Sequence, residues 1–144
     1  MDGRFNNIHQ GLTCAEARRI LSLSVADLES QSDFYMAAAH LINCSCVETE
    51  DALIKFITQS STEQAVKIAR RKAVEILARL GVKRAVPVIG ECLNSDDSYL
   101  VENAAWSLKE LSETTFLFNQ KMIALLRQPE QSTRVLIQTL SALN

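Results

Sequence analysis

The segment Arg70–Leu80, with the sequence RRKAVEILARL, decides the fold of this chain. Its apolar side chains recur with helical spacing, at Ala73, Ile76, Leu77 and Leu80. Because an α-helix completes one turn in about 3.6 residues, these side chains form a single stripe along its surface. The segment therefore predicts an amphipathic helix that buries one face.

The same apolar pattern occurs four times along the chain. Ala73 corresponds to Ala104, 31 residues later, to Leu136, a further 32 residues later, and to Ala37, 36 residues earlier. The residues four and seven positions after each of these are also apolar or cysteine. A recurrence at this period is typical of stacked helix pairs, in which neighbouring units bury a continuous core.

Shorter apolar helices are expected between the repeats, over 51–59, 84–93 and 117–127. The helix over 14–29 breaks the period and has a polar face, which is typical of a cap. We therefore expect a single all-α domain over 1–144, a helical solenoid. Its expected parts are a cap helix at about 13–29, repeats at about 33–59, 62–93 and 97–127, and an incomplete repeat at 132–144.

Local signals mark the expected helix ends. Gly81 follows the first stripe and can adopt the left-handed conformation that ends a helix. Pro87 falls in the first turn of the next helix, where its missing N–H costs little. Two acidic residues, Asp96 and Asp97, precede the helix that contains Tyr99. Two pairs fit the capping box, Thr13 with Glu16 and Ser61 with Gln64.

Composition excludes several classes of function. The chain has 15 basic and 17 acidic residues, so no excess charge points to nucleic acid or to an anionic membrane surface. No apolar run approaches the roughly 18 residues of a membrane span. Residues 1–11 are polar, which does not fit a signal peptide. The sequence contains no Ser-His-Asp catalytic order, no glycine-rich phosphate-binding loop and no metal-ligand spacing. We therefore assign no catalytic residue.

Four cysteines are present, at Cys14, Cys44, Cys46 and Cys92. The spacing of Cys44 and Cys46 is too tight for a zinc knuckle. We therefore expect reduced, mostly buried thiols and no metal site. His40 lies on an apolar helix, where a hydrogen-bonded structural histidine is expected rather than a catalytic base.

The repeats resemble a known family. The stretches RRKAVEILARLG, AVPVIGECL and DDSYLVENAAWSL are similar to HEAT repeats of the phycobilin lyase type, especially the E subunits of the E/F lyases of cyanobacteria and red algae. TCAEARRIL and SDFYMAAAHLI are similar to the opening helix pair of that family. The most specific part is Tyr99–Trp106. The resemblance implies a right-handed α-solenoid of HEAT-like, armadillo-type repeats.

It also implies a function. Members of that family attach an open-chain tetrapyrrole, a phycobilin, to a cysteine of a phycobiliprotein subunit, working with an F-type subunit. The phycobilin is then the substrate, no cofactor is bound permanently, and the reacting thiol belongs to the acceptor. The implied location is the cyanobacterial cytoplasm or the algal plastid stroma. The alternative is a non-enzymatic HEAT scaffold that binds phycobiliproteins or other proteins, including in phycobilisome turnover.

Candidate bilin contacts follow from the chemistry of the pigment. Arginine can pair with its propionates, a carboxylate can accept its pyrrole N–H groups, and aromatic faces can pack on its rings. The candidates are Arg70, Arg71, Tyr99, Glu102, Asn103 and Trp106. Structural interpretations compete with this one: Arg71 and Glu102 would form an ion pair between repeats, and Trp106 would belong to the core.

The last helix of the chain lacks a following partner. It carries a stripe of large apolar side chains: Leu136, Ile137, Leu140 and Leu143. Leaving such a stripe exposed to water would lose the free energy gained by burial, roughly 1.5–3 kcal/mol for each side chain. We therefore predict a partner interface here, covered by a second copy, by an F-type subunit or by further chain.

Overall fold

A computed structural model describes residues 11–111, 120 and 123–124. Among these residues every regular element is a helix, which confirms the predicted all-α class. The α-helices are α2 (Cys14–Leu21), α3 (Asp33–His40), α4 (Val47–Thr58), α5 (Gln64–Arg79), α6 (Val86–Glu91) and α7 (Ser98–Glu110). Short 3-10 turns join them: η2 (Val25–Asp27), η3 (Leu41–Asn43), η4 (Lys83–Ala85) and η5 (Cys92–Asn94).

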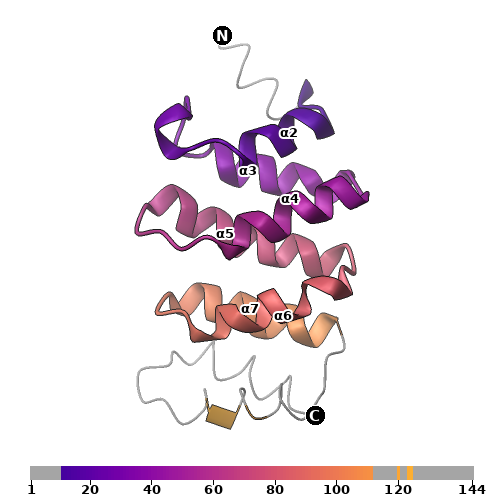
Figure 1. Ribbon diagram of the computed structural model, residues 1–144, viewed down its shortest axis with the longest axis vertical. Helices are drawn as coiled ribbons and strands as arrows, with labels where there is room; N and C mark the ends of the chain where they lie inside the picture. Colours follow the sequence, from indigo (N-terminus) through magenta and orange to yellow (C-terminus); the bar gives the residue numbers. More distant parts are fainter. Residues whose placement is uncertain (1–10, 112–119, 121–122, 125–144) are drawn as a thin grey trace.

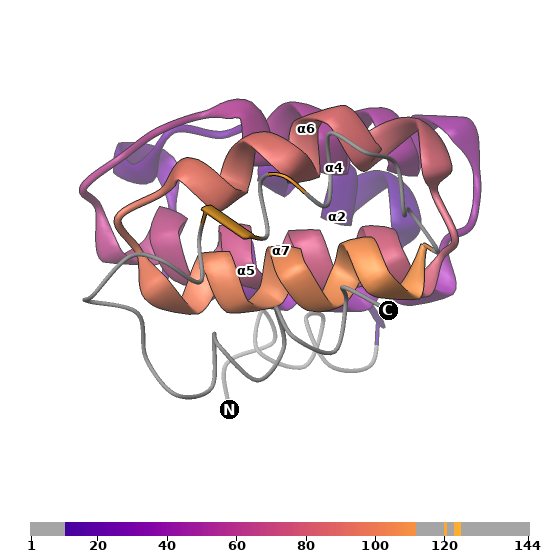
Figure 2. The same ribbon diagram turned by 90° about the horizontal axis from the view of Figure 1, so that it is seen from below.

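The helices stack as a solenoid with two layers. Figure 1 shows the stack running from α2 at one end to α7 at the other. In the view along the stack, α4 and α6 lie on one side and α5 and α7 on the other (Figure 2). The contacts add α2 to the layer of α4 and α6, and α3 to the layer of α5 and α7. The most extensive packing is between α5 and α7 and between α3 and α5. The second layer is therefore the continuous spine of the molecule.

Small residues allow the spine helices to approach closely. Ala69 and Ala73 of α5 and Ala104 and Ala105 of α7 are all fully buried. Ser107 is also buried, and its hydroxyl donates to the carbonyl of Val74 across the same interface at 3.2 Å. Larger members of the predicted stripes fill the space around them, among them Leu41, Leu77 and Leu108. The apolar period of the sequence thus predicts the buried face.

The first helix differs from its expected form. The helix expected over 13–29 ends at Leu21, and η2 follows as a separate turn. The α2 helix packs on α3 and on α4, so it is the first helix of a pair rather than an isolated cap. The carboxylate of Asp33 accepts the backbone N–H groups of Glu29 and Ser30, both at 3.0 Å, and so fixes the loop that turns the chain back into α3.

Most of the predicted helix ends are present. Thr13 Oγ1 accepts the N–H of Glu16 at 3.1 Å, and Asp97 accepts the N–H of Tyr99 at 3.2 Å. Pro87 lies in the first turn of α6. The capping box predicted for Ser61 and Gln64 is wrong: α5 begins at Gln64, and Ser61 accepts instead the N–H of Glu63, at 3.0 Å.

Gly81 ends α5 as predicted. Its φ of 70° lies in the left-handed region, which a side chain would disfavour. The N–H of Val82 donates to the carbonyl of Leu77, and that of Gly81 donates to Ala78, both at 3.0 Å. This pair of bonds is a Schellman motif, and it turns the chain from the spine layer toward α6.

Two predicted features lie outside the described residues. They are the partner interface of Leu136, Ile137, Leu140 and Leu143, and nearly all of the helix expected over 117–127. Both remain predictions.

The cysteines correct the sequence analysis. Cys14 and Cys44 form a disulfide, with their Cα atoms 5.7 Å apart, instead of the expected reduced thiols. The two cysteines lie 30 positions apart in the sequence, with no local signal that they pair, and the α2–α3 packing brings them together. Cys46 and Cys92 are free. Burial raises the pKa of the Cys92 thiol, as expected for an inert core cysteine.

We expect reduction of the Cys14–Cys44 disulfide to lower the free energy of unfolding by about 3–4 kcal/mol, because the bond closes a loop of 30 residues and restrains the unfolded chain. Urea unfolding, with a chelator present and with or without reductant, measures the change. A Cys14→Ser/Cys44→Ser variant is the control and should not respond to reductant. Equal stability of the wild-type chain in both conditions would contradict a formed disulfide.

Candidate functional site

Basic and aromatic side chains meet along the spine layer. The guanidinium of Arg71 lies 4.8 Å from the ring centre of Tyr99, and that of Arg79 lies 5.2 Å from the ring centre of Trp106. The ammonium of Lys72 lies 5.4 Å from the ring centre of Tyr35. All three cations come from α5, and the rings come from α3 and α7. We call this surface the α5 face, and it combines positive charge with flat aromatic surface.

A carboxylate lies at the centre of the α5 face. Glu75 accepts from Arg79 Nε at 2.7 Å and from Lys72 Nζ at 3.1 Å. Burial alone would favour the neutral acid, but the two hydrogen bonds outweigh it, so the pKa of Glu75 is lowered. Glu75 is therefore ionised at neutral pH and orients both cations.

A second polar cluster fixes α7 against α5. Arg71 donates from Nε and Nη2 to the two carboxylate oxygens of Asp97, at 2.9 and 3.1 Å. The same carboxylate caps α7 through the N–H of Tyr99. Asn103 Nδ2 donates to the backbone carbonyl of Arg71 at 3.3 Å. These bonds set the position of Tyr99 relative to α5.

A cleft of about 210 Å³ opens between α5 and α7. It is lined by Glu75, Arg79, Glu102, Asn103 and Trp106. Two carboxylates, one guanidinium, one amide and one indole thus converge on one small space. Such a set can accept N–H groups, pair with an acid group and pack on a flat ring.

The structure brings together five of the six candidate bilin contacts. Glu102, Asn103 and Trp106 line the cleft, and Arg71 and Tyr99 form a cation–aromatic pair on the same α5 face. Arg70 lies elsewhere, because its Nη2 donates to the carbonyl of Ile57 at the end of α4, at 3.0 Å.

Two details correct the sequence analysis. Arg71 was expected to form an ion pair with Glu102, but it forms its ion pair with Asp97 instead. Sequence reasoning also missed Glu75 and Arg79, although they follow Arg71 and Lys72 by one and two turns on α5. The sequence held a signal for them, because residues three or four apart on a helix lie next to each other on its surface.

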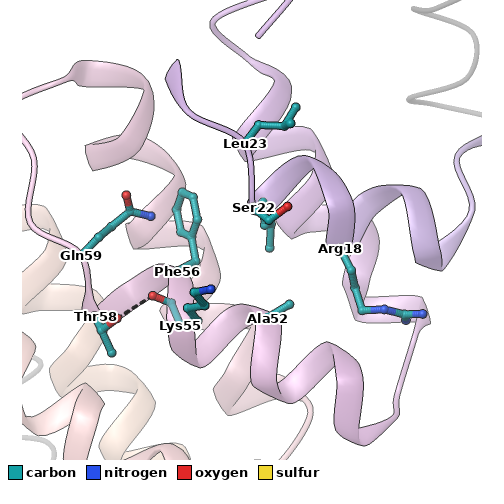
Figure 3. Close-up of a pocket in the computed structure, with 9 residues that line it drawn as sticks. Arg18, Ser22, Leu23, Ala52, Lys55, Phe56, Thr58 and Gln59 are labelled. Carbon is teal, nitrogen blue, oxygen red and sulfur yellow. Dashed lines mark hydrogen bonds between the residues drawn. The ribbon is translucent and has the colours of Figure 1, made fainter. Parts of the chain in front are cut away.

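A larger hollow, of about 290 Å³, lies between α2 and α4. Figure 3 shows its lining, which includes Leu23, Lys55, Phe56 and Gln59. Arg18 borders it, but its guanidinium points away from the hollow and donates to Thr49 at 3.3 Å and to the sulfur of Cys46 at 3.5 Å. The polar groups of the candidate site do not converge here, so we place the candidate site on the α5 face.

Residues 50–143 match the family described as HEAT repeats. The chain belongs to the HEAT-repeat family. The match includes α5, α6 and α7, and therefore the helices that form the cleft. None of the helices in the described part of this HEAT-repeat chain has the length and apolar character needed to cross a membrane.

Two curated relatives are similar in sequence. The bilin biosynthesis protein CpeY of Synechococcus sp. (strain WH8020) is 51% identical over 122 residues, which cover 84% of this HEAT-repeat chain and 29% of CpeY. The uncharacterized phycocyanin operon protein Y of Pseudanabaena tenuis (strain PCC 7409) is 38% identical over all 144 residues, or 34% of that protein. The chain thus spans about a third of the length of the curated relatives it matches.

A solved structure has the same fold. A chain in the complex of CpcE and CpcF of phycocyanin lyase from Nostoc sp. PCC7120 aligns with a TM-score of 0.70 and 29% sequence identity. The alignment covers 92% of this HEAT-repeat chain and 53% of the lyase chain. The helical solenoid fold predicted from the repeats is therefore confirmed.

Proposed function

We propose that this chain is a subunit or part of a phycobilin lyase or bilin chaperone, which helps attach an open-chain tetrapyrrole to a cysteine of a phycobiliprotein. The observation that carries the proposal is the 51% identity to the bilin biosynthesis protein CpeY across 84% of the chain. The similarity to a chain of the CpcE–CpcF phycocyanin lyase complex supports the same chemistry.

The geometry of the α5 face suits a bilin. At the cleft, the ionised Glu75 and the side-chain oxygens of Glu102 can accept pyrrole N–H groups, and the charge of Glu75 favours a protonated pigment. The half-exposed Arg79 can turn from Glu75 toward a propionate. Trp106 packs partly against the core, and the indole face that Arg79 now covers would be free for a pyrrole ring once that guanidinium has turned to a propionate.

The size of the cleft implies a partner. Sites that enclose a drug-sized ligand measure about 300–1,000 Å³, and the cleft has about 210 Å³. It would therefore hold one end of a bilin and leave the remainder to another surface. The partners proposed here are an F-type lyase subunit, which would cover the stripe of Leu136, Ile137, Leu140 and Leu143, and the phycobiliprotein subunit that supplies the thiol.

Co-expression tests the function. The chain is produced with a bilin source, a phycobiliprotein acceptor subunit and a candidate F-type subunit. We expect the acceptor to carry pigment that survives denaturation, because a thioether bond resists unfolding. The control replaces the acceptor cysteine by serine and should give no covalent pigment.

The alternative function is a HEAT scaffold that binds a phycobiliprotein without handling the pigment. The repeats favour it as much as they favour a lyase, because such folds present extended binding surfaces. A scaffold would bind the acceptor subunit but leave both its pigmentation and the spectrum of free bilin unchanged. That result with every partner would replace the lyase proposal.

A further inference from the structure

Three metal-binding side chains converge at the first helix pair, on elements separate from α5 and α7. Cys14 is the first residue of α2, His40 is the last residue of α3, and Cys44 follows η3. One imidazole nitrogen and the two sulfurs all lie within 4.8 Å of one another. His40 and Cys44 are four residues apart, and the α2–α3 packing brings Cys14 beside them.

This ligand set favours zinc. Thiolate sulfur and imidazole nitrogen are the donors that zinc prefers, at about 2.3 Å and 2.0–2.1 Å. In a tetrahedral site these lengths place neighbouring donor atoms roughly 3.5–3.8 Å apart. In the disulfide form the three donors lie within 4.8 Å of one another, so the two bonded sulfurs must move apart to this separation when the disulfide is reduced. Two thiolates also neutralise a divalent ion, which suits a cluster in which Cys44 is buried.

We propose that this cluster is a redox-gated zinc site, formed by Cys14, His40 and Cys44 when the Cys14–Cys44 disulfide is reduced. A small-molecule thiol supplies the two electrons: two of its molecules become a disulfide, and both cysteines become thiols. Zinc(II) then displaces the two thiol protons and takes the neutral imidazole. Water occupies the fourth position, because His40 and Cys14 are only partly buried.

The helix ends favour this arrangement. The positive end of α2 stabilises a thiolate at Cys14, and the negative end of α3 stabilises the cation near His40. Either the disulfide or the zinc ion would hold the start of α2 against the turn after α3. The two states therefore exclude each other, and the site is independent of the bilin function proposed for the α5 face.

Cobalt(II) titration of the 144-residue chain tests the proposal, because cobalt replaces zinc and a thiolate–cobalt bond absorbs in the near ultraviolet. We expect the reduced chain to bind an equimolar amount of cobalt with this absorption, and zinc to displace it. The disulfide form should give none. Zinc should also raise the melting temperature of the reduced chain, a readout that requires no variant.

Variants identify the ligands. We expect each of three variants to weaken cobalt binding by about a hundredfold: Cys14→Ser, Cys44→Ser and His40→Gln. This is on the order of the binding free energy of a structural zinc site divided among its ligands. Cys46→Ser and Cys92→Ser are matched controls and should bind as the wild type does. The proposal is overturned if the reduced wild-type chain binds no better than the Cys14→Ser/Cys44→Ser variant. It is equally overturned if Cys46→Ser abolishes binding while His40→Gln does not.

Discussion

Replacing Phe34 by alanine should destabilise the chain by about 3–5 kcal/mol, the cost of emptying a buried aromatic site. Phe34 of α3 is 1% exposed and meets Phe56 of α4 edge to face, with ring centres 5.2 Å apart. The contact joins the two layers at the first repeats. Because small domains have only about 5–15 kcal/mol of stability, this loss is a large fraction of the total.

Urea unfolding followed by circular dichroism measures the effect of Phe34→Ala. Tyr35→Ala is the matched control, since it removes the neighbouring aromatic side chain, which is 37% exposed. The control loses one exposed contact with Lys72 and should cost less than about 1 kcal/mol. Equal losses for the two variants would mean that the described burial of Phe34 against Phe56 is wrong.

Asp97→Ala should lower stability by roughly 2–3 kcal/mol. The substitution removes the cap of α7, worth about 1 kcal/mol, and both bonds to Arg71. Breaking a fully buried pair costs about 3–5 kcal/mol, and this pair is slightly exposed, at 8% for Asp97 and 22% for Arg71. The expected loss therefore lies between these two values.

Asp96→Ala provides the comparison, because Asp96 is the adjacent acid and is exposed. Its loss should change stability by less than about 0.5 kcal/mol. Arg71→Ala and the double variant Arg71→Ala/Asp97→Ala complete a double-mutant cycle. If the double variant loses the sum of the two single losses, Arg71 and Asp97 do not interact, and the ion pair is wrong.

The sequence was sufficient to predict the fold because burial is encoded in the apolar period. Ala73, Leu77, Ala104 and Leu108 share that period, and all four are buried between neighbouring helices. Caps were predictable where one residue determines the local geometry, as at Asp97 and Gly81. The length of α2 was not, because no glycine or proline marks its end at Leu21; there the hydroxyl of Ser22 donates to the carbonyl of Arg19 at 2.6 Å.

Partner choice was the part that the sequence could not settle. Spacing places Arg71 near the start of α7, where both Asp97 and Glu102 are within reach. Which carboxylate the guanidinium reaches depends on the offset of α7 along α5. The Cys14–Cys44 disulfide likewise depends on how α2 packs beside the turn after α3. Contacts between repeats require the three-dimensional stack.

The most direct test of the proposed function is the visible absorption of a phycobilin titrated with the chain and a candidate F-type subunit. We expect the wild-type chain to shift and sharpen the pigment spectrum, because a cleft holds the bilin in one protonated conformation. Trp106→Ala and Glu102→Gln should weaken binding about tenfold or more, the loss of a stacking face or of a charged acceptor. Lys55→Ala, in the larger hollow between α2 and α4, should bind as the wild type does. Two results would contradict a bilin site on the α5 face. One is a pigment spectrum that the wild-type chain does not change. The other is a spectral change that Trp106→Ala causes as fully as the wild type does and that only Lys55→Ala abolishes.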